Sequence, residues 1–275
     1  TSGTTGAPKG VMLTHYALLR LARALAKRQV LNASERFYSI APFFHCSGLT
    51  HGLLTNLVAG STYFAPNAYS PDESFAVIRI EGVTAYHGFV EPLQHIADNG
   101  RANIGDLSAF DRAWFSAPAA RMAQLERDLG VKMCELYGLT ETGGNVSICI
   151  ADDPEEMRFD SDGRPHDGLE VRIVDPNTGA LLPEGGSGEI QVRGWNVMRG
   201  YFRDPDATAG AISPEGWFAT GDQGQLLAGG YLRFIARIKD IIRVGGENLS
   251  PAEVEGVLLT HPAVIEVAVV AAPDA

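Results

Sequence analysis

Apolar residues in the first half of the chain alternate between helical and strand-like spacing. After Thr14, apolar positions at 18, 21, 22 and 25 follow the i, i+3, i+4, i+7 spacing of one helical face. Residues 70–73 read Ser-Pro-Asp-Glu, an N-cap hydroxyl followed by proline at the first helical position and glutamate at the third. They predict a second helix that buries Phe75, Val77 and Ile78. The flanking runs 61–64 and 83–86 are predicted to be strands that pair in parallel.

The pattern changes along the rest of the chain. A helix is predicted over 119–129, stopped by Gly130, and then a strand over 131–136 that runs into a loop at Tyr137 and Gly138. Apolar and polar residues alternate in 171–173 and 190–192 around a turn at 175–179, so 165–235 is predicted to be antiparallel, as a small barrel or sandwich. Beyond Asp240 we expect a strand at 241–242, a helix opened by the capping residues 250–253 with Val254, Val257 and Leu258 on one face, and a strand over 264–270.

The composition is that of an ordinary globular protein. Apolar residues make up 45% and charged residues 20% of the 275 positions, which excludes disordered, collagen-like and membrane-embedded classes. Lysine and arginine total 22 against 33 aspartates and glutamates, giving a net charge of −11. That sign opposes sequence-independent binding of nucleic acid, so we expect no nucleic-acid partner. Any polyanionic ligand must be held by a local site.

The chain carries no sign of a secretory or membrane-spanning segment. It does not open with a basic stretch followed by an apolar one, and its apolar run 264–272 is short and contains Glu266. Cys46, Cys134 and Cys149 are far apart, so neither a disulfide framework nor a zinc site is indicated. A reducing, cytoplasmic setting is the expectation.

The opening residues 1–10 have the chemistry of a phosphate-binding loop. Their glycines let backbone N–H groups approach an anion, their hydroxyls add donors, and Lys9 adds a positive charge. The loop is not a Walker A motif, because Lys9 follows Pro8 and precedes Gly10. A flexible turn rich in glycine and threonine is the alternative interpretation of this segment alone.

Four motifs together resemble the acyl-adenylate-forming (AMP-binding) superfamily. They are the loop 1–10, residues 137–141 (Tyr-Gly-Leu-Thr-Glu), residues 220–222 (Thr-Gly-Asp) and residues 237–240 (Arg-Ile-Lys-Asp), in the order of the family. The similarity is greatest to AMP-forming acyl-CoA ligases such as fatty-acyl-CoA synthetases. It implies ATP, Mg²⁺ and coenzyme A as ligands, and a fatty or other hydrophobic carboxylic acid that is activated as an acyl-adenylate and transferred to CoA. The alternatives are an amino-acid adenylation domain that loads a carrier protein, and a nucleotide-binding fragment without turnover.

The resemblance also implies roles for individual residues. The loop with Lys9 surrounds the β- and γ-phosphates, Thr140 contacts the α-phosphate, and Glu141 holds Mg²⁺. Asp222 accepts hydrogen bonds from the ribose hydroxyls. The implied nucleotide-binding set is Thr1, Ser2, Gly3, Thr4, Thr5, Gly6, Lys9, Ser116, Ala117, Tyr137 (against the adenine), Gly138, Thr140, Asp222 and Arg237 (at the ribose or phosphate), and the catalytic set is Lys9, His45, Thr140 and Glu141.

Each of these residue types also has a purely structural interpretation. Glu141 could be a solvated loop acid, Asp222 could bond its own turn, Tyr137 could be a core residue, and Arg237 could pair with Asp240 at the surface. His45 lies in the segment 41–49, which resembles the family segment next to the acyl carboxylate, but a histidine among phenylalanines can equally belong to a core.

The remaining implications concern the acyl pocket and the domains. Residues 86–92 are a candidate wall of the acyl pocket, with Val90 assigned to core packing. Lys239 corresponds to the hinge, and Gly245, Gly246 and Glu247 to a segment that faces CoA after domain rotation. The implied fold is α/β: a partial AMP-binding domain over 1–238, with a βα part over 1–160 and a β-barrel-like part over 161–238, and the start of a small α+β mobile domain over 239–275. Because the family's catalytic lysine motif is missing, we expect an internal fragment that is impaired by itself; its oligomeric state is not predicted.

Overall fold

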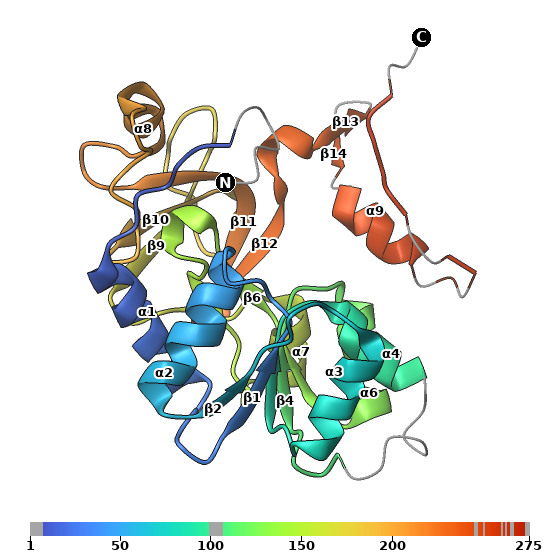
Figure 1. Cartoon of the computed structure of the whole chain (residues 1–275). Coiled ribbons are helices and arrows are strands. Elements are labelled where there is room, and N and C mark those ends of the chain that lie inside the picture. The colour runs from blue at the N-terminus through green and yellow to red at the C-terminus, as the bar shows by residue number, and fades with distance from the viewer. Residues whose placement is uncertain are drawn as a thin grey trace.

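A computed structural model describes residues 8–98, 107–244, 247–249, 251–259, 261, 263–264 and 267–272. The chain forms a parallel sheet with helices on both faces, and an antiparallel region stacked against one end of it (Figure 1). The C-terminal residues lie to one side of the antiparallel region. Among the described residues, no helix combines the length and the apolar character needed to cross a membrane.

The parallel sheet has five strands in the order β2-β1-β3-β4-β5. The predicted strands at 61–64 and 83–86 both exist and are parallel, but they are not neighbours, so the predicted direct pair is wrong. The strand between them, β1, buries three of its four residues, whereas β2 buries none, and the more apolar strand takes the interior position. The bounds are Arg36–Ser39 for β1, Thr62–Phe64 for β2, Ala85–His87 for β3, Arg112–Trp114 for β4 and Lys132–Cys134 for β5.

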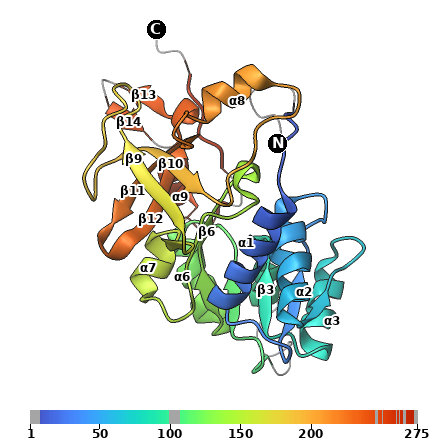
Figure 2. The same cartoon turned by 90° about the vertical axis from the view of Figure 1, so that its left-hand side faces the viewer.

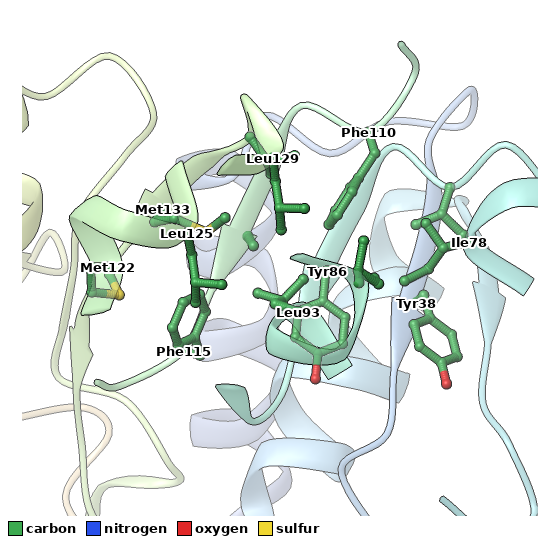
Figure 3. Close-up of a cluster of buried hydrophobic side chains, with 14 residues drawn as sticks. Tyr38, Ile78, Tyr86, Leu93, Phe110, Phe115, Met122, Leu125, Leu129 and Met133 are labelled. Atoms are coloured by element: carbon green, nitrogen blue, oxygen red, sulfur yellow. The ribbon is translucent and has the colours of Figure 1, made fainter. Parts of the chain in front are cut away.

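Side chains alternate between the two faces of this sheet and build two separate cores. On one face, Tyr38, Tyr86 and Met133 pack under α3 (Pro71–Ile80), α4 (Val90–Asp98) and α6 (Ala119–Leu129), as Figure 3 shows. On the other face, their neighbours Phe37, Ala85 and Cys134 pack against α1 (His15–Arg28) and α2 (Thr55–Ala59). The period of two predicts this division. Both layers therefore hold the carboxyl ends of the strands in fixed positions.

The predicted helix ends are confirmed by their hydrogen bonds. Thr14 Oγ1 accepts from the backbone N–H of Ala17 at 3.0 Å, and Ser70 Oγ accepts from Glu73 N–H at 3.4 Å. Gly130 ends α6 with φ of 66°, a left-handed conformation that suits glycine. These helices begin and end where their capping residues stand.

The predicted strand over 131–136 is two strands in two sheets, so that prediction is wrong. The chain leaves the parallel sheet at Glu135, and β6 (Leu136–Tyr137) pairs instead with β7 (Ser147–Ile148). The Glu135 carboxylate accepts hydrogen bonds from the backbone N–H groups of Leu136 at 3.2 Å and Ala117 at 3.1 Å. These bonds satisfy backbone groups that a continuous ladder would have paired.

The antiparallel prediction for 165–235 is confirmed. Four strands lie in the order β12-β11-β10-β9, and Val192 of β10 stands opposite Val171 of β9. The short sheet β6-β7-β8 lies beside this sheet (Figure 2). Tyr137 of the short sheet packs in one buried cluster with Ile190, Val192 and Leu232 of the four-stranded sheet. The bounds are β8 Arg164–Pro165, β9 Leu169–Val174, β10 Gly188–Gly194, β11 Phe218–Leu227, β12 Tyr231–Arg237, α7 Glu155–Asp160 and α8 Pro205–Ala211.

The C-terminal residues form a hairpin and a helix. Strands β13 (Ile242–Val244) and β14 (Glu247–Leu249) pair antiparallel, and α9 (Pro251–Leu258) begins at the predicted proline, while Ser250 lies outside the described residues. The predicted strand over 264–270 is wrong for its described residues, which have no regular structure. A strand requires a neighbouring backbone edge, and here the Val269 N–H donates to the Glu255 side chain at 2.8 Å.

Candidate active site

A cavity of about 530 Å³ lies between the carboxyl ends of the parallel strands and the antiparallel sheet. Its walls include the residues that follow β3 and β4, the turn after β6, the start of β11 and the end of β12. The carboxyl edge of an open parallel sheet is the usual place for a ligand in this class of fold. At this cavity, residues from separate motifs can therefore act together.

Seven of the residues predicted for the site line this cavity. They come from distant parts of the sequence: Lys9, His45, Ser116, Gly138, Thr140, Glu141 and Arg237. Ala117, Tyr137 and Asp222 do not contribute to its lining; Tyr137 and Asp222 are buried beside it. Thr1, Ser2, Gly3, Thr4, Thr5 and Gly6, with Gly245 and Gly246, lie outside the described residues, and Glu247 lies in β14.

A tight turn presents Thr140 and Glu141. Residues Thr140–Thr142 form a 3₁₀ turn, η2, in which the Thr142 hydroxyl accepts from Leu139 N–H at 3.1 Å. A Cβ at Gly138 would lie 2.4 Å from the carbonyl oxygen of Gly144, so only glycine fits there. The sequence Tyr-Gly-Leu-Thr-Glu thus places a hydroxyl and a carboxylate side by side on a rigid turn.

Glu141 and Lys9 both contact Tyr201. The Tyr201 hydroxyl donates to Glu141 Oε1 at 2.9 Å, and Lys9 Nζ lies 4.6 Å from the centre of the Tyr201 ring. Burial and the Glu141 carboxylate both raise the pKa of Tyr201, so this hydroxyl stays a donor. Tyr201 was missed from the sequence because it stands outside every motif. Glu141 is buried, which contradicts its interpretation as a solvated loop acid.

Asp222 is held by two partners behind the cavity wall. Its Oδ2 accepts from the Tyr137 hydroxyl at 2.6 Å, and Arg237 Nε lies 2.9 Å from its Oδ1 as an ion pair. Arg237 therefore pairs with Asp222, its partner across β11 and β12, and not with Asp240. Burial raises the pKa of Asp222, while the Tyr137 hydrogen bond and the Arg237 charge lower it. The Tyr137 ring also stacks on Phe234, with centroids 5.8 Å apart.

The third wall of the cavity comes from the segment after β1 and the end of β3. His45 is exposed and lines the cavity, so it is not the core residue of the alternative interpretation; its Nδ1 accepts from Ser47 N–H at 3.1 Å. The π-helix η1 (Ser47–Leu54) follows and carries Ser47 and His51. A π-helical segment is unusual and often marks a functional site. Val90 packs against the first core, as predicted.

Three side chains on this wall are hydrogen-bonded or stacked to one another. Ser47 Oγ lies 2.6 Å from His87 Nε2, the His51 and His87 rings stack with centroids 4.3 Å apart, and His51 Nε2 lies 3.2 Å from the carbonyl oxygen of Gly144. Burial lowers the pKa of His51 to about 4 and that of His87 well below its usual value. Both imidazoles are therefore neutral at pH 7. The sequence analysis placed Ser47 in the segment 41–49 and His87 in the candidate wall 86–92, but it missed His51, which lies just beyond the first of these segments.

Lys239 lies in a short connection. The 3₁₀ turn η4 (Ile238–Asp240) joins β12 to the hairpin of β13 and β14, and Lys239 is exposed within it. None of the three buried clusters among the described residues includes a residue beyond Ala236. The segment after η4 is attached to the rest of the described molecule mainly through α9, which lies next to β12.

Comparisons with known proteins identify relatives over the whole chain. The chain is 35% identical over 277 residues to the medium-chain fatty-acid–CoA ligase of Escherichia coli, and 36% identical over 276 residues to a feruloyl-CoA synthase of Amycolatopsis. Both alignments include 100% of this chain but 48% and 56% of the relative. The chain thus spans about half the length of the curated relatives it matches.

Solved structures also match this chain over all or nearly all of its length. The o-succinylbenzoate coenzyme A synthetase of Bacillus subtilis in complex with AMP matches 100% of this chain and 56% of its own, with 31% identity and a TM-score of 0.88. The ATP-bound protein MatB of Rhodopseudomonas palustris matches 98% of this chain and 53% of its own, with 29% identity and a TM-score of 0.87. The model of the AMP-binding enzyme family matches residues 1–202, and the chain therefore belongs to the AMP-binding enzyme family.

Proposed function

We propose that this chain is the nucleotide- and acid-binding part of a longer AMP-forming acid–thiol ligase. In the reaction, a carboxylate oxygen attacks the α-phosphate of ATP and pyrophosphate leaves. The thiol of coenzyme A then attacks the acyl carbonyl and AMP leaves. The observation that carries the proposal is the convergence of Lys9, Thr140, Glu141 and Arg237 on one cavity. The relatives named as CoA ligases and synthetases support it.

The phosphate end of the cavity has a suitable charge distribution. Lys9 would neutralise the departing phosphates, and Thr140 would donate to the α-phosphate, in keeping with a reaction that depends on positioning and charge. Among the described residues, no group of three acidic, histidine or cysteine side chains could enclose a metal by itself. Glu141 is a buried carboxylate with one oxygen bound by Tyr201. A single carboxylate together with substrate phosphates is how Mg²⁺ is usually bound, so Glu141 fits this cation.

The nucleoside would lie on the side of the cavity that Ser116 lines, with Ala117 next in sequence and the Asp222 pair buried behind that wall. Glu135 fixes the backbone of Ala117, which supports the assignment of this segment to the adenine. We propose that Asp222 binds the ribose hydroxyls, with Tyr137 and Arg237 orienting its carboxylate. Tyr137 is buried against Phe234 and bonded to Asp222, and these contacts favour a positioning role over direct contact with the base.

Later steps would use the C-terminal segment. We propose that Lys239 is the hinge, and that rotation at η4 brings Gly245, Gly246 and Glu247 toward coenzyme A. The short exposed connection supports this assignment, and so does the finding that no described residue beyond Ala236 belongs to any of the three buried clusters. Hydrophobic acids are proposed as the substrate class, because Phe89 and Phe115 line the cavity.

The decisive experiment is exchange of labelled pyrophosphate into ATP by the full-length protein, with and without carboxylic acids. We expect exchange that depends on both an acid and Mg²⁺, and formation of AMP and a thioester once coenzyme A is added. Exchange with amino acids alone, and no thioester with coenzyme A, would favour a carrier-loading domain. Binding of ATP without any exchange would reduce the proposal to a nucleotide-binding protein.

A further inference from the structure

A short segment between β10 and α8, residues 198–202, connects the turn η2 to the phosphate-binding loop. On one side, the backbone N–H of Met198 donates to the carbonyl oxygen of Glu141 at 2.8 Å. On the other side, the backbone N–H of Phe202 donates to the carbonyl oxygen of Gly10 at 2.7 Å. The segment therefore fixes the described end of the loop relative to the turn that carries Glu141.

Tyr201 is the residue of this segment whose contacts extend into the cavity. Its backbone N–H donates to Thr208 Oγ1 at 2.9 Å, and the Thr208 hydroxyl donates in turn to the carbonyl oxygen of Asp204 at 2.8 Å. Thr208 belongs to α8, and Asp204 caps the first turn of that helix. These bonds hold the buried tyrosine with its hydroxyl at Glu141 and its ring beside Lys9.

The hydroxyl of Tyr201 controls the orientation of the Glu141 carboxylate. It donates to Oε1 at 2.9 Å, and it keeps its proton because burial and the adjacent carboxylate both raise the pKa of the phenol. The last torsion of a glutamate side chain has only broad minima, so a donor on one oxygen restricts the direction of the other. A carboxylate that binds a cation benefits from this restriction, because a ligand held in place loses less freedom when the cation arrives.

The ring of Tyr201 makes a separate contact with Lys9. Lys9 Nζ lies 4.6 Å from the ring centroid, within the distance at which an ammonium group is attracted to an aromatic face. One side chain thus contacts both charged groups that the proposed function assigns to Mg²⁺ and to the phosphates. The two contacts use different atoms of the side chain, so substitutions can remove them separately.

We propose that Tyr201 is a positioning residue for adenylate formation: its hydroxyl orients the Glu141 carboxylate for Mg²⁺, and its ring holds Lys9 for the phosphates of ATP. The inference rests on the proposed function and adds a residue to the same site. Loss of the hydroxyl should weaken cation binding. Loss of the ring should weaken ATP binding as well.

Two variants of the full-length protein separate the hydroxyl from the ring. Tyr201→Phe removes the hydroxyl alone, and Tyr201→Leu removes the ring too. Both should need about tenfold more Mg²⁺ for half-maximal pyrophosphate exchange, since partners that orient a metal ligand typically change metal affinity or activity by about 10- to 100-fold. At saturating Mg²⁺, only Tyr201→Leu should raise the KM for ATP, by about threefold.

A binding measurement provides a readout that does not depend on turnover. Mn²⁺ prefers the same oxygen ligands as Mg²⁺ and is paramagnetic, so electron paramagnetic resonance gives its affinity for the protein with ATP in the absence of an acid. We expect this affinity to fall by about tenfold in Tyr201→Phe. The double variant with Glu141→Gln should bind Mn²⁺ no more weakly than Glu141→Gln alone, because the hydroxyl acts through that carboxylate.

Tyr231→Phe is the matched control, because the Tyr231 hydroxyl also donates to a buried carboxylate, that of Asp153, and neither residue lines the cavity. It should leave the Mg²⁺ and Mn²⁺ dependence unchanged. An unchanged Mn²⁺ affinity in folded Tyr201→Phe, or additive losses in the double variant, would overturn the role of the hydroxyl. An unchanged KM for ATP in Tyr201→Leu would overturn the role of the ring.

The same experiments distinguish this inference from a structural role and from the proposed function. Equal losses of exchange at every Mg²⁺ concentration, with no change in Mn²⁺ affinity, would mean that Tyr201 supports only the fold. If one variant does not fold, the other decides the role of the hydroxyl, since both lack it; failure of both would show a structural role and overturn the inference. If the parent protein supports no exchange with any acid, the proposed function fails and this inference with it. If the parent exchanges and the variants match it, this inference alone fails.

Discussion

The contact between Tyr137 and Asp222 offers a sharp test of how the buried wall supports the cavity. Tyr137→Phe removes only the hydroxyl that donates to Asp222 Oδ2 at 2.6 Å, and the ring can keep its stacking on Phe234. The Asp222 side chain is 2% exposed, so water does not readily replace the lost donor. Arg237 stays beside the other carboxylate oxygen. The variant therefore has a buried carboxylate with one hydrogen bond fewer.

The size and the pH dependence of the effect follow from these contacts. A hydrogen bond to an ionised group contributes about 1.5–3 kcal/mol, so the free energy of unfolding should fall by about that amount at neutral pH. Burial raises the pKa of Asp222, and the hydrogen bond from Tyr137 partly offsets that rise. Removal of the hydrogen bond should therefore raise the pKa of Asp222 further. When the pKa of a carboxyl group is higher in the folded state than in the unfolded state, the free energy of unfolding falls as the pH rises from the unfolded pKa, here 3.8, through the folded pKa. The deficit of the variant should therefore be largest above the folded pKa of Asp222 and smaller below it.

The assay is urea unfolding of both proteins at a series of pH values from about 4 to about 8, combined with the KM for ATP in the exchange assay. Tyr231→Phe is a matched control, because the Tyr231 hydroxyl donates to the buried Asp153 at 2.7 Å and neither residue lines the cavity. Both variants should lose stability. Only Tyr137→Phe should also raise the KM for ATP, by about tenfold.

Two results would refute this reasoning. A stability deficit of Tyr137→Phe that does not change with pH would mean that its hydroxyl does not favour the charged form of Asp222. Equal KM values for ATP in the two variants would mean that the Tyr137–Asp222 pair has no part in nucleotide binding, whatever it contributes to the fold.

Three further predictions concern single side chains. Glu141→Gln in the full-length protein should reduce acid-dependent exchange by at least about tenfold and should be partly rescued by more Mg²⁺; unchanged exchange at limiting Mg²⁺ would refute the metal assignment. Lys239→Pro should leave exchange intact and slow thioester formation, since proline restricts the turn η4; equal losses in both half-reactions would argue against a hinge. Burial and Asp162 raise the pKa of Glu135 from 4.5 to about 8, so the parent should lose stability between these pH values while Glu135→Gln does not. The free energy of unfolding of the variant relative to the parent should therefore rise by up to about 1.4 kcal/mol per pH unit in this range. Urea unfolding that gives the same difference throughout the range would contradict this prediction.

Short-range structure was predictable where one residue determines it. Thr14 and Ser70 each accept a hydrogen bond from a backbone N–H three residues further on, and Gly130 adopts a left-handed conformation. The helices begin or end at these residues, as predicted. Alternation over 171–173 and 190–192 likewise predicted antiparallel strands, because a period of two is a local property.

Pairing between distant segments was not predictable in the same way. The insertion of β1 between β2 and β3 depends on which strand buries more surface, and that comparison involves three segments at once. The break at Glu135 depends on β7 and on the Ala117 backbone, neither of which is near in sequence. The sequence from 131 to 136 contains no feature that identifies either partner.

In the candidate site, too, local features were predictable from the sequence and contacts between distant segments were not. The motifs predicted seven of the residues that line the cavity, because glycine, hydroxyl and acidic side chains in a fixed order are properties of the sequence, but they did not predict that Tyr137 and Asp222 lie behind its wall. What those side chains can do depends on neighbours that the motifs do not contain: Tyr201 joins Lys9 to Glu141, and Tyr137 holds Asp222. Burial lowers the pKa of His51 and of His87, so both side chains are neutral at pH 7, whereas histidines at the surface titrate near pH 6.5.

The two ends of the cavity differ in electrostatic character because different parts of the fold line them. At the phosphate end, the meeting of the two regions brings charged groups together, with Arg237 of β12 and Glu141 of the turn after β6. At the acyl end, the side chains come from η1 and β3 on the parallel-sheet side, and burial removes charge there. Under the proposed function, the nucleotide and the acid would therefore contact different groups of one cavity, and substitutions at the acyl end should change the choice of acid while the KM for ATP stays constant.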